Sequence, residues 1–391
     1  MIGGTVGTAF PTASLAIATT YLWRLAFGLT MQRIASFLAI CALSAACSTD
    51  LDINAPYKNI TVVEGLLNMR DSINFIKINK GFLGDGDALV YAQIADSNEW
   101  NSDAIEYARV VRRRNGQVMG TYDLRDTLVT GREPGTFHSP DQRMYYLVTD
   151  YRVVEQISGQ LVPLYLDEES DYSVELRIKG EDISSTTNIV NDFSIQAADQ
   201  STDGNQVINL LTGSNFSSFE LNWTAGPNGK RYVADYRFNY REVRNGEIGE
   251  LKTITNRMAT VVRIGTTPGE EMSATIDGQR FFENIAATIP NDPTVDRRIF
   301  LGVDFIISVA NEEFHTFLTL TEPVSGIIED RPSYSNIVNG YGIFGSRYIK
   351  QIIGKRLGAS SLNYLADSDL LATRRFCSGM PLDVLSPNYC P

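Results

Sequence analysis

Apolar and polar residues alternate through most of the chain after residue 47. Between Tyr172 and Lys179 every second residue is apolar, and Gly180 follows. The range from Tyr232 to Tyr240 repeats the pattern. A period of two is typical of a β-strand with one buried and one solvated face. The sequence therefore predicts strands over both ranges.

Asn-Gly pairs mark the predicted turns. Asn228-Gly229 precedes the second of these strands and Asn245-Gly246 follows it. Both residue types tolerate positive φ, which two-residue hairpin turns require. Phe219 to Trp223 would supply the strand before the first turn. We therefore predict a three-stranded meander from Ser218 to Ile254.

Four further ranges have strand character. Ile105 to Val111 and Val118 to Leu124 flank the pair Asn115-Gly116, which predicts another hairpin. Val62-Val63 and Ile76 to Ile78 predict two more strands.

Helical patterns are few. Asp277 can cap a helix that ends before Pro290 and has apolar residues at every fourth position: Phe281, Ile285 and Ile289. Asn311 can cap a second helix with apolar residues on one side: Phe314, Phe317 and Leu318.

Many short strands with regular turns and two isolated helices favour packed antiparallel sheets over alternating α/β layers. At 391 residues the chain exceeds one typical domain. The polar stretch 197–205 is the predicted boundary. We expect a mainly β protein with two antiparallel β-sandwich-like (immunoglobulin-like) domains, 47–196 and 206–391, a few short helices, and an N-terminal extension over 1–46.

The N-terminus has the layout of an export signal. From Met31, a short start that carries Arg33 leads into an apolar run of about ten residues, and small residues then precede Cys47. Such a run is short of the ~20 residues that span a bilayer. The segment resembles the lipobox of bacterial lipoproteins, in which the cysteine is acylated and begins the mature chain. One departure is Ser44, where the lipobox prefers leucine.

Residues 1–30 precede a signal that is complete from Met31, so we expect translation to begin there. The alternative is a longer signal or a membrane anchor that begins near Ala13. Arg24 and Arg33 interrupt that alternative segment.

The cysteine count predicts a disulfide. Cys41 would be lost with the signal and Cys47 would carry lipid, which leaves Cys377 and Cys390. Exported proteins meet an oxidising compartment, so we expect these two to pair in the C-terminal tail. Two cysteines without a neighbouring histidine make a poor zinc site.

The charge argues against a nucleic-acid partner. It is −12 for the whole chain, whereas phosphate binding needs clustered Lys and Arg. Loss of residues 1–46 removes two arginines and no acid, which gives −14. The basic cluster Arg112-Arg113-Arg114 lies beside Asn115-Gly116 and is interpreted as a solvated hairpin end.

Gly340, Gly342 and Gly345 have the G-x-G-x-x-G spacing of dinucleotide-binding loops. That motif needs a helix after the glycines and an acidic residue about twenty positions further on. Instead, the range Tyr348 to Ile353 is rich in β-branched isoleucine, which predicts a strand. We interpret the three glycines as structural, at a strand bend or bulge, and expect no bound cofactor.

Catalytic patterns are weak. The two histidines are His138, in a Pro-flanked loop, and His315, at the edge of the second predicted helix. The sequence lacks H-E-x-x-H and G-x-S-x-G, so it offers neither a zinc-protease motif nor a nucleophile elbow. We predict no catalytic residue and no metal ligand.

Several stretches resemble a group of Bacteroidota outer-membrane lipoproteins that is classed as a domain of unknown function. They are NAPYK (54–58) with VVEGLL (62–67), IKINKGFL (76–83), FHSPDQ (137–142) and SNIVNGYGIFGSR (335–347). The resemblance implies a cell-envelope location without implying an activity, and it covers most of the mature chain.

Together these observations predict a non-catalytic binding or accessory module at the outer membrane, anchored there by lipid on its periplasmic or extracellular face. It would serve nutrient uptake or surface adhesion, with a TonB-dependent transporter or a surface polymer as its partner. The alternative is a surface hydrolase that acts on glycans or peptides.

Overall fold

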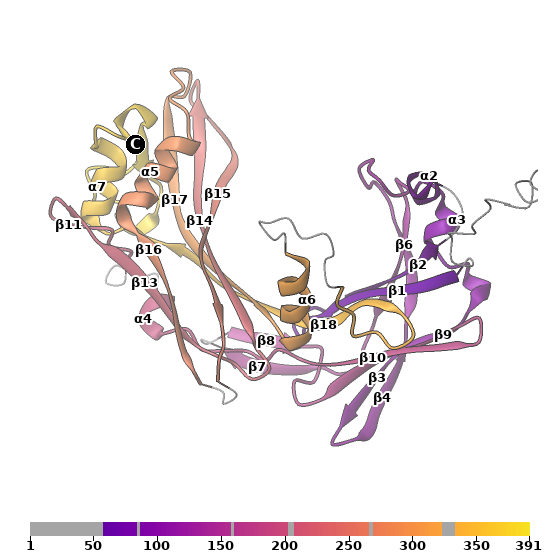
Figure 1. Cartoon of the computed structure of the whole chain (residues 1–391). Helices are drawn as coiled ribbons and strands as arrows, with labels where there is room; N and C mark the ends of the chain where they lie inside the picture. Colours follow the sequence, from indigo (N-terminus) through magenta and orange to yellow (C-terminus); the bar gives the residue numbers. More distant parts are fainter. Residues whose placement is uncertain (1–57, 84–86, 158–159, 202–206, 266–268, 323–332) are drawn as a thin grey trace, which may run out of the picture. The chain divides into compact units, whose positions relative to one another are not determined.

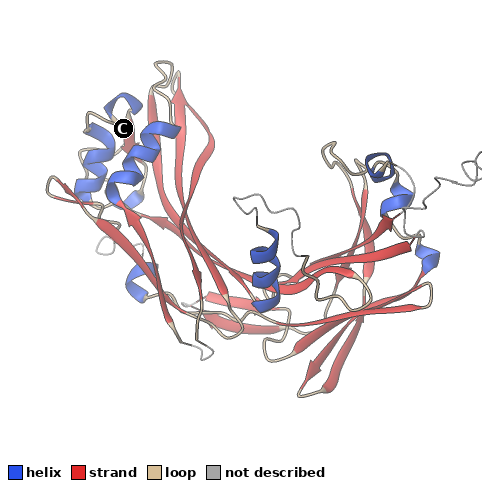
Figure 2. Cartoon of the chain, viewed as in Figure 1, coloured by secondary structure: helices blue, strands red, loops and turns tan. Residues whose placement is uncertain are grey.

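The computed structural model describes residues 58–83, 87–157, 160–201, 207–265, 269–322 and 333–391. It confirms a mainly β protein with sandwich-like packing and a few short helices (Figure 1, Figure 2). Cys47 lies outside the described residues, so its predicted acylation stays a prediction.

One large sheet runs through the fold. Its strands, in spatial order, are β15 (Glu247–Val262), β14 (Arg231–Arg244), β17 (Arg297–Ala310), β18 (Tyr341–Lys355), β1 (Lys58–Leu67), β2 (Asn74–Leu83), β6 (Gln142–Leu147) and β5 (Arg125–Val129). A ninth strand, β19 (Phe376–Ser378), pairs with β17 off this path.

A second sheet supplies the other layer in the first half of the chain. Its order is β10 (Glu181–Asn188), β9 (Asp171–Ile178), β3 (Ile105–Arg114) and β4 (Gln117–Asp123). Val174 and Leu176 from this sheet share a hydrophobic core with Val63 and Ile76 from the large sheet. Burial of one face of each sheet in a common core is the packing of a β-sandwich.

Three two-stranded ribbons complete the β-structure: β13 (Ser218–Thr224) with β16 (Glu271–Asp277), β7 (Val153–Ile157) with β8 (Gln160–Leu164), and β11 (Leu211–Thr212) with β12 (Asn215–Phe216). The helices are α2 (Ala88–Ala92), α3 (Ala95–Asn98), α4 (Ala197–Gln200), α5 (Gly278–Thr288), α6 (Glu312–Thr321) and α7 (Ala359–Asp367). Short 3-10 turns are η1 (Ser102–Ala104), η2 (Ala372–Arg374) and η3 (Pro381–Asp383).

Aromatic side chains fill the core in the second half of the chain. Trp223 of β13 lies against Tyr232 of β14, with ring centroids 6.2 Å apart, and Phe219 stacks on Phe305 of β17 at 5.4 Å. Helix α5 adds Phe281, which is buried in the same core. The ribbon β13–β16 and helix α5 therefore cover one face of β14 and β17.

Strand β18 connects the two halves of the large sheet. Its beginning, Tyr341–Ser346, pairs in parallel with β1, whereas Arg347–Lys355 pairs antiparallel with β17. The strand thus changes partner at Ser346, and helix α6 lies beside it (Figure 1).

Of the three glycines in the G-x-G-x-x-G spacing, Gly340 immediately precedes β18, and Gly342 and Gly345 lie in its first part. Gly342 has φ +116°, and a side chain there would collide with the carbonyl oxygen of Val63 on β1. A Cβ at Gly345 would approach the Asn311 side-chain oxygen to 3.1 Å. These positions lie in a strand, without the helix that a dinucleotide loop needs.

A buried polar junction holds the neighbouring elements. Asn311, at the end of β17, donates through Nδ2 to the Thr187 hydroxyl at 2.7 Å, and its backbone N–H donates to Ser346 O at 3.2 Å. The Ser346 hydroxyl accepts from Val190 N at 3.0 Å. Since Asn311 and Ser346 are fully buried, each bond satisfies a group that would otherwise be costly to bury.

Local predictions were accurate. The Asn115-Gly116 and Asn245-Gly246 turns both have positive φ at both residues and connect β3 to β4 and β14 to β15. Asp277 caps α5 by accepting from Arg280 N, and Asn311 caps α6 by accepting from Phe314 N.

The predicted three-stranded meander from Ser218 to Ile254 is wrong. Only β14 and β15 form the expected hairpin, and β13 pairs with β16 instead. Strand β14 has β15 on one side and β17 on the other, so neither of its edges is free for β13.

The stretch 197–205 does not divide the described chain. It begins with helix α4, and Lys355 of β18 donates to Ala198 O and Asp199 O. Strands from both sides of the stretch share the large sheet, and Tyr57–Pro391 forms one compact unit.

The expected disulfide is present in the C-terminal tail. Cys377 and Cys390 are joined with an S–S distance of 2.07 Å. Cys377 lies in β19, which pairs with β17, so the bond ties the last residues of the chain to the large sheet.

We predict that Gly342→Ala lowers the free energy of unfolding by about 2 kcal/mol or more. A positive φ alone costs a side chain roughly 1–2 kcal/mol, and here the collision with Val63 adds to it. Urea denaturation of the full chain measures the change.

Two other glycines provide matched controls. Gly116 has φ +78° but open space around it, and Gly135 has open space without a positive φ. Gly116→Ala should cost about 1 kcal/mol, and Gly135→Ala should cost less. A Gly342→Ala variant as stable as Gly116→Ala would contradict the close-approach argument.

Candidate functional site

A polar cleft of 390 Å³ lies over the outer face of β1 and β2. We call it the β2 cleft. Strands β1 and β2, the end of α3 and the loop 132–142 line it, and its walls include Glu64, Lys77, Asn79, Glu99, Arg132 and Phe137. Its volume is within the usual range for sites that bind small molecules.

Strand alternation places polar side chains on this face. Ile76 and Ile78 of β2 are buried in the core, so Lys77 and Asn79, which alternate with them, point to the opposite side of the sheet. The register puts Glu64 directly across from Lys77, and Lys77 Nζ lies 3.1 Å from Glu64 Oε2. This cross-strand ion pair fixes both side chains in the cleft.

The α3 wall is held by buried hydrogen bonds. The Asn98 amide donates to Ala92 O at 2.7 Å and to Ile94 O at 2.8 Å. Next to it, Glu99 Oε1 accepts from Arg143 N at 3.0 Å. The position of Glu99 is therefore set by its neighbours.

The loop 132–142 is anchored along its length. Arg132 N donates to Pro140 O at 3.0 Å, and His138 N donates to Ala92 O at 2.8 Å. The Gln93 amide donates to Gly135 O and to Thr136 O, at 2.9 and 2.7 Å. These bonds fix the loop that carries Phe137, whose side chain is nevertheless 56% exposed.

His138 and Lys80 also line the cleft. His138 Nδ1 lies 3.3 Å from Gln93 O. A carbonyl only accepts, so Nδ1 carries the proton in this bond and Nε2 keeps its lone pair in the neutral ring. Lys80 Nζ donates to Asp96 O at 2.8 Å and lies 5.7 Å from the centre of the Trp100 ring.

The charges in the cleft balance. Lys77 and Arg132 face two carboxylates, from Glu64 and Glu99. Lys80 stands opposite the buried Thr61, so its side chain begins on the core side of the sheet. The residues that line the cleft do not include Ser, Thr, Cys or Tyr, so it lacks the usual hydroxyl or thiol nucleophile.

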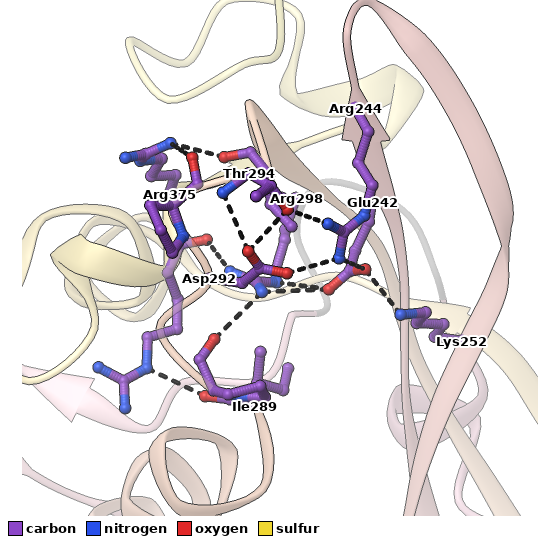
Figure 3. Close-up of polar contacts among 12 residues, drawn as sticks. Glu242, Arg244, Lys252, Ile289, Asp292, Thr294, Arg298 and Arg375 are labelled. Atoms are coloured by element: carbon purple, nitrogen blue, oxygen red, sulfur yellow. Dashed lines mark hydrogen bonds and ion pairs between the residues drawn. The ribbon is translucent and has the colours of Figure 1, made fainter.

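A second polar cluster surrounds the start of β17 (Figure 3). Arg298 is fully buried and pairs with Glu242 Oε1 at 3.1 Å. Its guanidinium also donates to Arg374 O at 2.8 Å and to Pro290 O at 3.1 Å. Arg375 in turn donates to Val295 O at 2.6 Å. These contacts tie the C-terminal tail to the loop after α5.

The carboxylates of this cluster are held in their charged form. Burial alone would raise the pKa of Glu242, but hydrogen bonds from Lys252 and Arg244 outweigh it and lower that pKa. Hydrogen bonds from Thr294 and Arg244 lower the pKa of Asp292. Both carboxylates are paired with cations, and Arg375 donates to backbone carbonyls, so we interpret this cluster as structural.

The predicted site residues lie outside the β2 cleft. Cys377 and Cys390 form the tail disulfide, Gly340 immediately precedes β18, and Gly342 and Gly345 lie in it. His138, one of the two histidines of the sequence, does line the cleft, and so do parts of the stretches 62–67, 76–83 and 137–142. Arg132 has no sequence signal of its own.

In the described part of the chain, no helix is long and apolar enough to cross a membrane. A search of the same residues found no group of three or more His, Cys, Asp or Glu side chains that could hold a metal ion.

We predict that Arg298→Met lowers the free energy of unfolding by about 2–3 kcal/mol, because the carbonyl oxygens of Arg374 and Pro290 lose a buried donor. Glu242 keeps its pairs with Arg244 and Lys252. Arg257→Met is the matched control: that arginine is 56% exposed and pairs with Asp235, so its loss should cost less than about 1 kcal/mol. Urea denaturation at pH 7 compares them. Equal losses would contradict the structural role of Arg298.

The same cluster predicts that the stability of the fold depends on pH. Glu242 and Asp292 have lowered pKa values in the folded state, so their contribution is complete above the unfolded values of about 4. It is lost as the pH falls from about 5 through the lowered values. The Glu242→Gln variant should therefore lose less stability than the wild type between pH 5 and pH 2, measured by thermal unfolding. Identical pH profiles for the variant and the wild type would contradict this contribution of Glu242.

No protein-family model matches this chain, and a search of curated proteins finds no match either.

Proposed function

We propose that this protein is a lipid-anchored, non-catalytic binding module of the bacterial outer membrane. It holds a small polar ligand in the β2 cleft and serves a TonB-dependent uptake system or adhesion to a surface polymer.

The anchored geometry of the cleft is the observation that carries the proposal. The ion pair of Glu64 and Lys77 and the hydrogen bonds of the loop 132–142 fix the walls before any ligand arrives. A preformed site loses little conformational freedom on binding, so more of the contact energy becomes affinity. An exposed Phe137 on a fixed loop has no role in the core and suits contact with a ligand.

Export to the cell envelope has independent support. The signal layout before Cys47 is that of an acylated lipoprotein, and the disulfide Cys377–Cys390 suits an oxidising compartment. The stretches that resemble Bacteroidota outer-membrane lipoproteins also contribute to the cleft: β1 provides Glu64, β2 provides Lys77, and the loop provides Phe137.

A surface hydrolase is the second candidate, because the carboxylates of Glu64 and Glu99 and the imidazole of His138 line one cleft. Carboxylate pairs perform glycoside hydrolysis. We favour binding because each group already has a structural partner: Glu64 has Lys77, Glu99 has the Arg143 backbone, and His138 has Gln93 O.

We predict that Cys47→Ser moves the protein from the membrane fraction to the soluble fraction of its native host. Stable anchoring needs more than one acyl chain, and the cysteine would carry them. Ser48→Ala is the control and should stay with the membrane. Immunoblots of separated fractions measure both, and membrane retention of Cys47→Ser would count against the anchor.

A further inference from the structure

We infer that three exposed aliphatic side chains near the start of β1 insert into the interfacial region of the membrane that holds the anchor. We call them the α2 patch: Leu89 and Val90 of α2, and Ile94, the residue that precedes α3. The inference rests on the proposed lipid anchor and adds a second contact, which sets the orientation of the protein on its membrane.

The α2 patch is apolar, exposed and closely spaced. The exposed fractions are 65% for Leu89, 59% for Val90 and 45% for Ile94. All three lie within six residues of the chain, where the backbone forms two short helices. A single exposed aliphatic residue is ordinary on a protein surface, whereas a group of large ones indicates a contact surface.

Hydrogen bonds hold the patch in its exposed position. Asp87 caps α2 by accepting from Leu89 N at 2.8 Å. The Asn98 amide donates to Ala92 O at 2.7 Å and to Ile94 O at 2.8 Å, and Asn98 is itself buried. The three side chains would have to break this network to turn into the core. Contact with another apolar phase removes them from water without that cost.

The patch lies near the point where the anchored segment enters the fold. Lys58 begins β1 and pairs with Leu83, the last residue of β2. Leu89 follows six residues later, and α3 contacts β2 (Figure 1). If the mature chain begins at Cys47, the ten residues 48–57 separate the lipid from Lys58. A fully extended chain of that length spans about 40 Å at most, so the anchor keeps the patch within reach of the bilayer.

The tether makes a weak contact sufficient. Once the lipid is in the bilayer, contact of the patch is an intramolecular event, and a short flexible linker gives it an effective concentration in the millimolar range. The driving force is the apolar area taken out of water, as for helices that lie in the membrane interface. The net charge of −12 gives no attraction to anionic lipids, so we expect the contact to persist at high salt.

Exposure alone does not select the α2 patch. The C-terminal tail has a comparable exposed group: Leu382, Val384 and Leu385. That group follows β19, which pairs with the start of β17, whereas β1 meets β18 beyond the other end of β17. A strand length of about 40 Å separates these two places. The tail group therefore provides a control for position.

Fluorescence quenching in vesicles tests the inference. Val90→Trp is made in the acylated mature protein, which is reconstituted into phosphatidylcholine vesicles with ordinary or brominated acyl chains. Bromine quenches tryptophan only at close range, so the emission added by Val90→Trp should fall about twofold or more in the brominated vesicles. Leu385→Trp is the matched control and should keep its emission. The wild type, with Trp100 and Trp223, gives the background.

A second measurement removes the anchor. The mature chain with Cys47→Ser is mixed with the same vesicles, and flotation gives its partition coefficient. The triple variant Leu89→Ser, Val90→Ser, Ile94→Ser should lower that coefficient about tenfold, and serine at the three positions of the tail group should not. Raised salt should leave the binding of the parent unchanged. Unfolding midpoints show whether each variant is folded.

The outcomes separate this inference from the proposed anchor. Quenching of Val90→Trp without quenching of Leu385→Trp supports the inference. Equal emission of Val90→Trp in both kinds of vesicle overturns it and leaves the patch to a protein partner, and quenching at both positions also overturns it. If mass spectrometry finds no acyl chain on Cys47, the proposed anchor fails. The partition of the unacylated chain then decides the inference, which is overturned if the triple patch variant binds like its parent.

Discussion

The large sheet is continuous because one strand pairs with two different partners along its length. Strand β18 pairs with β1 over its first residues and with β17 over the rest. The exchange requires close backbone approach at Gly342 and a buried polar junction at Asn311 and Ser346. Since β1 lines the β2 cleft and β17 contributes to the aromatic core, this exchange joins the candidate site to that core.

Local sequence signals predict the helix caps and two of the three Asn-Gly hairpin turns. The Asn-Gly hairpins, the caps Asp277 and Asn311, and the alternation in β9 and β14 all reflect interactions between residues close in sequence. The partner of β13 was missed because strand pairing depends on which edges remain open in three dimensions. A two-residue turn signal at Asn228-Gly229 could not reveal that both edges of β14 were occupied.

The cleft could not be predicted for a related reason. Glu64 and Lys77 meet through strand register, but Arg132 and Phe137 reach them through a loop anchored on Ala92 of α2 and on Gln93. Charged residues occur throughout the sequence, and only their convergence distinguishes these few. The polar cluster at Arg298 also joins distant segments, and the pairing of its carboxylates with cations gives it a structural role.

The order of the strands also affects how the chain can fold. Strand β1 begins at Lys58, but the segment it pairs with along one edge begins at Tyr341. During synthesis that edge stays open until nearly the whole chain has been made. Contacts of such long sequence separation slow folding and prolong the exposure of unpaired strands to aggregation. The edge of β1 that β18 covers should therefore be among the last parts of the large sheet to close during folding.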